Sequence, residues 1–364
     1  MRQKQFLAIL TAFAVLSGFA GCQGDIAEEP VNTEHTTHIT TMREQINDPE
    51  TELFQTETGG NDVDPENNIS IVSVVTESYP NDEYLSEPID KQIKLNGKDH
   101  DIGAEELILY EISNEDIRKL PLFYDLKSLS INIPPENEPV DLSPLSELSS
   151  LKYLAVHGTY TDFSFLDGMS NLEEMYIYGF DCETLENFPI NRSLISFQCD
   201  YCNFSDISWL SNLKSLKCLT LGETICENYA PIGNISSLED FRMGIESNYT
   251  VDFSFLKNLT GLKNFDYNDF SSKGADVNFA EIANCTELEN VYIYGKIDNI
   301  EFCRSMKKLK EFSFQGGGET FDISPLCDCH EIEKISLFCN FEMEDYEKLK
   351  STLQDCEITS HLDL

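Results

Sequence analysis

Residues 210–221 read Leu-Ser-Asn-Leu-Lys-Ser-Leu-Lys-Cys-Leu-Thr-Leu, and this stretch decides the fold. In its first half leucine recurs at every third position up to Leu216, a spacing typical of a tight helical turn. In its second half Leu219 and Leu221 are two residues apart, which places both side chains on one face of a short strand. The stretch therefore predicts a short helical or 3₁₀ segment that leads into a strand.

The same pattern recurs along the chain. Ten anchor positions equivalent to Leu216 are followed, in nearly every case, by apolar residues at the third and fifth positions, and their spacing is 21 to 26 residues. No single unit can bury its apolar face alone, so the units must stack. The anchors are Leu126, Leu151, Leu172, Leu194, Leu216, Leu238, Leu262, Leu288, Leu309 and Ile332.

These units resemble internalin-like leucine-rich repeats of the 22-residue type. The resemblance is carried by segments such as Asp141-Leu-Ser-Pro-Leu145 and Asp322-Ile-Ser-Pro-Leu326, and it covers residues 107–341. It implies an α/β solenoid, a leucine-rich-repeat horseshoe with a parallel β-sheet on the concave side and short helical or 3₁₀ segments on the convex side. We place the repeats at residues 126–341.

One feature departs from that family. Its repeats carry Asn eight residues after the anchor, whereas here Asn340 is the only Asn in the series. Hydroxyls and thiols satisfy fewer backbone groups than an amide does, so we expect looser turns. The other residues at this position are Thr159, Phe180, Cys202, Thr224, Glu246, Phe270, Lys296 and Gly317.

Cap regions are expected at both ends of the repeats. Residues 69–125 form the N-terminal cap, in which Ile71–Val75 is strand-like, Asn96-Gly97 predicts a β-hairpin and Ser113-x-x-Asp116 predicts a helix capping box. Residues 342–364 form the C-terminal cap, with a helix followed by a final strand near 357–362. The apolar face of that helix comprises Met343, Tyr346, Leu349 and Leu353.

The first 21 residues are typical of a secretion signal. Arg2 and Lys4 precede an apolar run that is too short to span a bilayer permanently. Residues 16–22 resemble a bacterial lipobox, with Phe19 in place of its usual Leu and with Cys22 as the lipidated residue. Lipid on Cys22 would anchor the chain to the membrane at the bacterial cell surface. The alternative is ordinary cleavage after Ala20, which would release a secreted protein.

Residues 22–68 predict a disordered acidic linker. Arg43 is their only basic residue, and they show no periodic apolar pattern. The whole chain has a formal net charge of −40. Because such a field repels phosphate backbones and anionic lipids, it argues against nucleic acid as a partner and leaves the lipid as the only expected membrane contact.

Eleven cysteines follow Cys22, and the repeat pattern places many of them in the core as small apolar residues. A zinc site at Cys327-x-Cys329-His330 or at Cys199-x-x-Cys202 is a weaker alternative, because neither has a second ligand pair at a convincing spacing. We therefore expect no metal and no cofactor. Cys339 and Cys356 are candidates for one disulfide. The expected core thiols are Cys182, Cys199, Cys226, Cys285, Cys303 and Cys329.

The concave face should expose the side chains two, four and six positions after each anchor. Tyr176-Ile-Tyr178-Gly recurs as Tyr292-Ile-Tyr294-Gly, which places paired tyrosines outward in both halves. Exposed tyrosine suits protein hot spots and sugar stacking, although tyrosine is also simply a good strand residue. The candidate binding residues are Tyr153, His157, Tyr176, Tyr178, Arg242, Tyr292 and Tyr294, with Tyr153, Tyr176 and Tyr178 as one cluster.

The function favoured by these features is an adhesion or binding protein that recognises a protein on a host or neighbouring cell. A glycan-binding accessory lipoprotein is the alternative, and it depends on the same tyrosines. Catalysis is not expected, because the six histidines are scattered and the chain contains no nucleophile elbow, phosphate loop or HExxH sequence.

Overall fold

The structure is a computed structural model that describes residues 91–134, 139–160, 162–179, 181–182, 188–245, 251–270, 277–316, 318 and 320–363. All of these belong to the second of the chain's two units, Pro88–Leu364. The expected secretion signal, Cys22, the acidic linker and the strand-like segment Ile71–Val75 lie outside the described residues.

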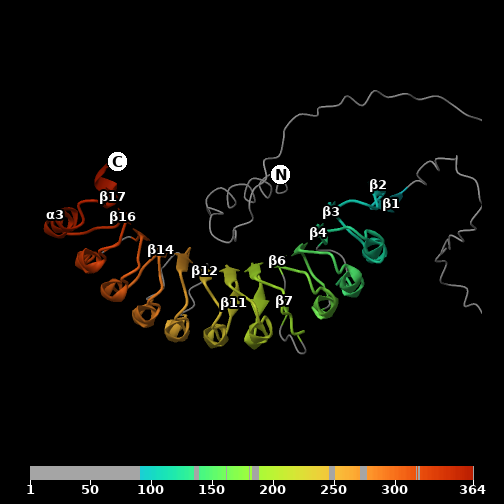
Figure 1. Ribbon diagram of the computed structural model, residues 1–364, viewed down its shortest axis with the longest axis horizontal. Helices are drawn as coiled ribbons and strands as arrows, with labels where there is room; N and C mark the ends of the chain where they lie inside the picture. The colour runs from blue at the N-terminus through green and yellow to red at the C-terminus, as the bar shows by residue number, and fades with distance from the viewer. Residues whose placement is uncertain are drawn as a thin grey trace, which may run out of the picture. The chain divides into compact units, whose positions relative to one another are not determined.

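Twelve strands form one sheet in which neighbouring strands are parallel. The sheet lines the inner, concave side of the curved array in Figure 1. This is the sheet predicted from the repeat spacing. Its strands are β3 (Glu106–Tyr110), β4 (Ser128–Asn132), β5 (Tyr153–His157), β6 (Glu174–Tyr178), β8 (Ser196–Asp200), β10 (Cys218–Gly222), β12 (Asp240–Ile245), β13 (Asn264–Asp269), β14 (Asn290–Tyr294), β15 (Glu311–Gln315), β16 (Lys334–Phe338) and β17 (Glu357–Ser360).

Short 3₁₀ helices form the outer, convex side (Figure 1). Most begin two residues after an Asp or Asn whose side-chain oxygen accepts a hydrogen bond from the first helical N–H, as Asp141 does from Ser143 at 2.9 Å. This explains the recurring Asp-x-Ser of the sequence. The helices are η1 (Leu120–Leu122), η2 (Ser143–Glu147), η3 (Ser164–Gly168), η4 (Ser208–Asn212), η5 (Ala230–Asn234), η6 (Phe253–Asn258), η7 (Ala280–Asn284), η8 (Glu301–Ser305), η9 (Ser324–Asp328) and η10 (His361–Asp363).

The core is continuous between these two sides. The ten anchors are at most 6% exposed, and the residues three and five positions later, such as Leu154 and Val156, are fully buried. Most of the expected core thiols are also buried, namely Cys199, Cys226, Cys285, Cys303 and Cys329. Each coil thus covers the apolar flank of the next coil, as stacking requires.

One coil has a polar residue at an inward position of its core. Asn191 is 4% exposed and occupies the position that holds an apolar residue in neighbouring coils. Its Oδ1 accepts hydrogen bonds from the backbone N–H groups of Ser193 and Leu194 at 3.0 and 2.8 Å. The buried amide therefore satisfies backbone donors that would otherwise carry a desolvation cost.

A second, smaller sheet pairs the backbone segments that follow strands β6, β8 and β10. Its strands β7 (Asp181–Cys182), β9 (Asn203–Phe204) and β11 (Ile225–Cys226) are parallel. Thr224, which occupies the family's Asn position, donates its hydroxyl to the carbonyl of Cys199 at 2.9 Å. In these coils backbone pairing and the Thr224 hydroxyl bond groups of the turn, and the expectation of looser turns stays a prediction.

The N-terminal cap has the predicted local structure. β1 (Gln92–Leu95) and β2 (Lys98–Asp101) form an antiparallel hairpin, with Asn96 and Gly97 at φ 43° and 74°. Helix α2 (Asn114–Ile117) begins at a capping box formed by Ser113 and Asp116. The parallel sheet already begins at β3, ahead of the first anchor at Leu126.

The C-terminal cap differs from its prediction in two respects. Helix α3 (Met343–Thr352) buries Tyr346 and Leu349, and β17 extends the sheet in parallel beside β16, both as expected. Met343, however, is 52% exposed, because it opens the helix between exposed Glu342 and Glu344.

The second difference concerns the proposed disulfide. Cys339 and Cys356 are both free thiols, so this pairing is not formed. The Cys356 sulfur instead contacts the carbonyl of Glu357 at 3.7 Å. Burial raises the pKa of each thiol to about 11. Both groups are therefore protonated near neutral pH, and the thiolate that disulfide formation requires is scarce.

Candidate functional site

The concave face presents its side chains in three columns, as predicted. Strand register aligns Tyr176 with Ala155 on one side and with Gln198 on the other, and it aligns Tyr178 with His157 and Asp200. Residues at equivalent positions on successive strands are therefore direct neighbours. This alignment determines which of the candidate side chains contact one another.

An upstream aromatic cluster comprises His157, Tyr176, Tyr178 and Tyr201. The His157 ring stacks on Tyr178, with centroids 5.5 Å apart, and meets Tyr176 edge-on at 5.3 Å. Tyr178 also contacts Tyr201 at 5.1 Å. Burial among the rings lowers the pKa of His157, which favours its neutral form. The cluster is thus a largely neutral aromatic surface spanning three coils.

Tyr153 lies in a different column from Tyr176 and Tyr178. It lies in the first column, where strand register puts it beside Glu174. Burial and then the negative charge of Glu174 raise the pKa of its hydroxyl. The described ring contacts of Tyr176 and Tyr178 are made with His157 and Tyr201 instead. His157 is thus in ring contact with both Tyr176 and Tyr178, and the grouping of Tyr153 with these two tyrosines as a binding cluster stays a prediction.

A downstream aromatic cluster comprises Phe270, Tyr292 and Tyr294. Phe270 packs against Tyr294 with ring centroids 5.6 Å apart, and both rings are at least 40% exposed. The Tyr292 hydroxyl donates to the Glu311 carboxylate at 2.5 Å. Burial and this bond raise the pKa of Tyr292. The paired tyrosines of the sequence therefore do face outward in both halves, and Phe270 joins the second pair.

Tyr201 has an unusual backbone conformation. The seventh position after the anchor adopts positive φ in several coils, and it is occupied by glycine at Gly158, Gly179 and Gly295. Tyr201 occupies the same position with φ 53°. A bulky side chain in this left-handed region is strained by about 1–2 kcal/mol. This backbone conformation places the Tyr201 ring at the edge of the concave face, where 46% of the side chain is exposed.

Between the clusters the face is polar. Arg242 on β12 lies in register with Asp266 on β13, and its charge lowers the pKa of Asp240 and Asp266 against a larger rise caused by burial. The amide of Asn264 donates to Asp240, and the amide of Asn290 donates to Asn264 at 2.6 Å. The positive charge of Arg242 is thus balanced by acidic neighbours on the concave face.

Asp200 lies beside the upstream aromatic cluster. Its carboxylate accepts a hydrogen bond from Gln198 Nε2 at 2.8 Å. Burial raises the pKa of Asp200, and hydrogen bonds from Gln198, Tyr176 and the backbone of Gly222 oppose that rise. All three of these donors are electrically neutral. A partly buried carboxylate is therefore fixed at the edge of an aromatic surface.

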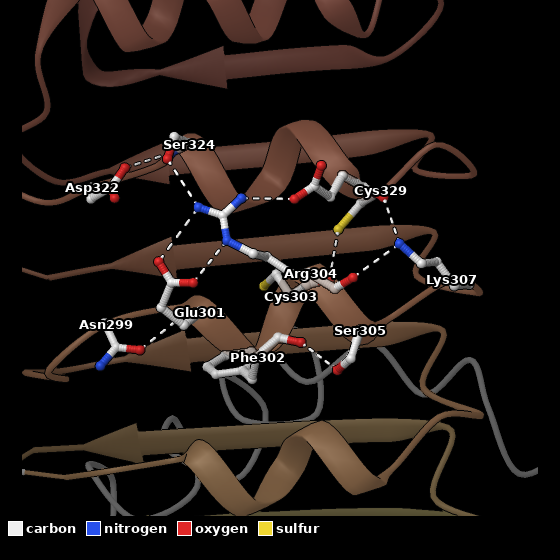
Figure 2. Close-up of polar contacts among 11 residues, drawn as sticks. Asn299, Glu301, Phe302, Cys303, Arg304, Ser305, Lys307, Asp322, Ser324 and Cys329 are labelled. Atoms are coloured by element: carbon white, nitrogen blue, oxygen red, sulfur yellow. Dashed lines mark hydrogen bonds and ion pairs between the residues drawn. The ribbon is translucent and has the colours of Figure 1, made fainter.

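The convex side forms a contrasting polar network. Arg304 on η8 donates to Glu301 at 2.8 Å and to Asp328 on η9 at 2.7 Å, and Lys307 donates to the carbonyl of Arg304. Figure 2 shows Arg304 bonded to Glu301 of its own helix and to Ser324 on the neighbouring coil. The charges of Arg304, Glu301 and Asp328 are satisfied by one another. The convex network is consequently a weaker candidate for ligand recognition than the exposed aromatic rings.

Two negative observations apply to the part of the chain that the structure describes. Within these residues no three His, Cys, Asp or Glu side chains are grouped so that they could hold a metal ion. No described helix has the length and apolar character needed to cross a membrane.

Comparison with known proteins supports the fold. No family model and no curated protein matches the chain. Among solved structures, an internalin (InlF) from Listeria monocytogenes is 21% identical, with 73% of this chain and 84% of that chain covered and a TM-score of 0.53. A chain of the mouse RP105/MD-1 complex is 14% identical, with 71% of this chain and 52% of that chain covered and a TM-score of 0.51. These likenesses and the twelve-stranded parallel sheet show that this chain folds as a leucine-rich-repeat solenoid.

Proposed function

We propose that this protein is a lipid-anchored binding protein of the bacterial cell surface, and that its concave face recognises another protein. The observation that carries the proposal is the pair of aromatic clusters on that face, whose exposed rings are Tyr201, Phe270, Tyr292 and Tyr294. Tyrosine rings supply rigid contact area with a polar tip, and they are enriched at protein hot spots. A solenoid also offers an extended concave surface that suits a large partner.

Anchoring can be tested on its own. We expect wild-type protein to incorporate a labelled fatty acid and to remain with the membrane fraction, because two acyl chains on Cys22 suffice for stable attachment. Changing Cys22→Ala should abolish the label. The control Cys356→Ala removes a half-buried thiol at the far end of the chain and should keep the label. An unlabelled wild-type protein in the medium would instead support cleavage after Ala20.

Recognition can be tested by site-specific photo-crosslinking on intact cells. A photoreactive residue at Thr220, on the concave strand β10, should give a discrete protein adduct. The same residue at exposed Lys257, on convex η6, is the matched control and should not. Replacing Tyr176 and Tyr178 with alanine should weaken the partner's affinity about 30-fold, the effect of losing about 2 kcal/mol at a hot spot.

Two outcomes would contradict this proposal. Adducts that form equally at both positions would show that the concave face is not selective. Glycan-array binding that depends on Tyr292 and Tyr294, without any protein adduct, would favour the glycan-binding alternative. That alternative uses the downstream cluster, whose exposed rings could stack on sugar faces.

A further inference from the structure

Arg242 is the only lysine or arginine in the middle and outer columns of strands β4 to β16. Strand register places it between Thr220 on β10 and Asp266 on β13. Asp240 precedes it by two residues on the same strand and so faces the same side of the sheet. The half-buried guanidinium therefore lies on the concave face with a carboxylate on its own strand and another on the next strand.

The hydrogen bonds of these two carboxylates come from amides. The Asn264 amide donates to Asp240, and Asn268 Nδ2 donates to Asp266 at 2.6 Å. Within the part of the chain that the structure describes, the Arg242 side chain makes no hydrogen bond and no ion pair. A guanidinium carries five N–H donors in a fixed fork. The charge of Arg242 is thus balanced by its neighbours, whereas its donors are not used by them.

This difference favours one kind of ligand group. An incoming carboxylate would be attracted by Arg242 but repelled by Asp240 and Asp266, and the net charge of −40 on the chain adds to that repulsion. A main-chain carbonyl has no net charge and is a strong hydrogen-bond acceptor. A neutral carbonyl is therefore a better match for Arg242 than an acidic group.

The downstream aromatic cluster lies within reach of the same ligand. Tyr292 on β14 is two strands from Arg242 in the same column, a separation of about 10 Å that an extended chain covers in about three residues. The side chains of Tyr292, Tyr294 and Phe270 are 38%, 40% and 46% exposed. Beside Arg242 the outer position is held by Gly244, where the lack of a side chain lets another main chain come close.

We propose that Arg242 binds main-chain carbonyl groups of an extended, uncharged segment of the partner protein, and that an apolar side chain of this segment packs on the Tyr292 ring. The planar fork of arginine can hold two acceptors in a fixed geometry, whereas lysine offers a compact point charge. This inference rests on the proposed function and gives the partner its chemistry.

The test begins with selection of binders to the full mature protein from a library of random twelve-residue peptides displayed singly on phage. We expect selected peptides to be poor in charged residues and to contain a large apolar residue. Arg242→Met should weaken the best peptide at least about tenfold, the effect of losing hydrogen bonds to a charged group. Lys334→Met is the matched control, since it removes an exposed concave cation outside this site, and it should change affinity less than about threefold.

Two further measurements separate carbonyl binding from charge and from folding. Arg242→Lys keeps the charge that balances Asp240 and Asp266, so it should keep the melting temperature, and it should still weaken the peptide about fivefold because the fork is lost. Each peptide bond of the ligand can also be replaced in turn by an alkene, which lacks the carbonyl. One replacement should cost about tenfold with wild type and less than about twofold with Arg242→Met, because the two changes remove the same interaction.

The outcomes distinguish this inference from the proposed function. Acidic peptides that need Arg242 and lose affinity steeply with added salt would overturn carbonyl binding and keep concave recognition. Peptides that need Tyr176 and Tyr178 but tolerate Arg242→Met would do the same, as would a ligand in which Arg242→Met silences no alkene replacement. Binders that ignore every concave variant, or a library without binders, would overturn both.

Discussion

Changing Phe279→Ala is expected to lower the free energy of unfolding by about 3–5 kcal/mol. Phe279 is 2% exposed and packs among three rings, with centroid distances of 4.8 Å to Phe253, 5.2 Å to Phe265 and 5.1 Å to Tyr267. These residues belong to two successive coils and the strand between them. Alanine would leave a cavity at the contact that joins the coils. Urea denaturation followed by circular dichroism measures the loss.

The matched control is Leu122→Ala. Leu122 is an apolar residue of similar size, but its side chain is 57% exposed, so its removal should change the unfolding free energy by less than about 0.5 kcal/mol. Phe279→Leu should fall between the two variants, because it retains part of the buried volume. A loss below about 1 kcal/mol for Phe279→Ala would show that the coils are not coupled through this cluster.

The sequence predicted the solenoid because stacking leaves few alternatives. A unit such as residues 210–221 has an apolar flank on either side and can bury it only against copies of itself. Strand β3 was placed in the cap rather than in the repeats, although Leu107 and Leu109 have the right spacing. The anchor position before them holds Ala104 instead of leucine, so the pattern is incomplete there.

The candidate site was predicted less completely. Alternation along each strand identified His157, Tyr176 and Tyr178, whose contacts follow directly from strand register. Tyr201 and Phe270 were missed because they lie seven and eight residues after their anchors, where the strand has ended and alternation no longer applies. A signal did exist for Tyr201, since the equivalent positions in the two preceding coils hold Gly158 and Gly179.

Spacing also could not separate tyrosines that share a face from tyrosines that touch. Tyr153 and Tyr176 are both outward residues of neighbouring strands, but they occupy different columns. Alternation also placed Asp200 on the concave face, but it could not show that the carboxylate lies against the bare strand at Gly222. Such relations arise from packing between coils and not from the pattern within one coil.

Changing Gly168→Ala should destabilise the array by about 1–3 kcal/mol or more, the cost of overpacking a close contact. Gly168 ends η3, and a Cβ atom there would be 2.0 Å from the carbonyl oxygen of Ser146 on η2. Both sides of this contact are backbone, so no side chain can rotate away. The two coils would have to separate. Urea denaturation measures the loss, and faster hydrogen exchange of η2 and η3 amides would locate it.

The repeat alignment alone gives the opposite expectation for this position. The last residue of the 3₁₀ helix is asparagine in the coils that end at Asn212, Asn234, Asn258 and Asn284, so a methyl group at Gly168 looks harmless from the sequence. Gly261→Ala is the matched control, because its added Cβ would meet no atom closer than 4.0 Å, and it should leave stability within about 0.5 kcal/mol of wild type. Equal stability of the two variants would mean that η2 and η3 can separate freely. A selective loss at Gly168 would instead show that the spacing between coils is set locally, by backbone contact, at this point of the stack.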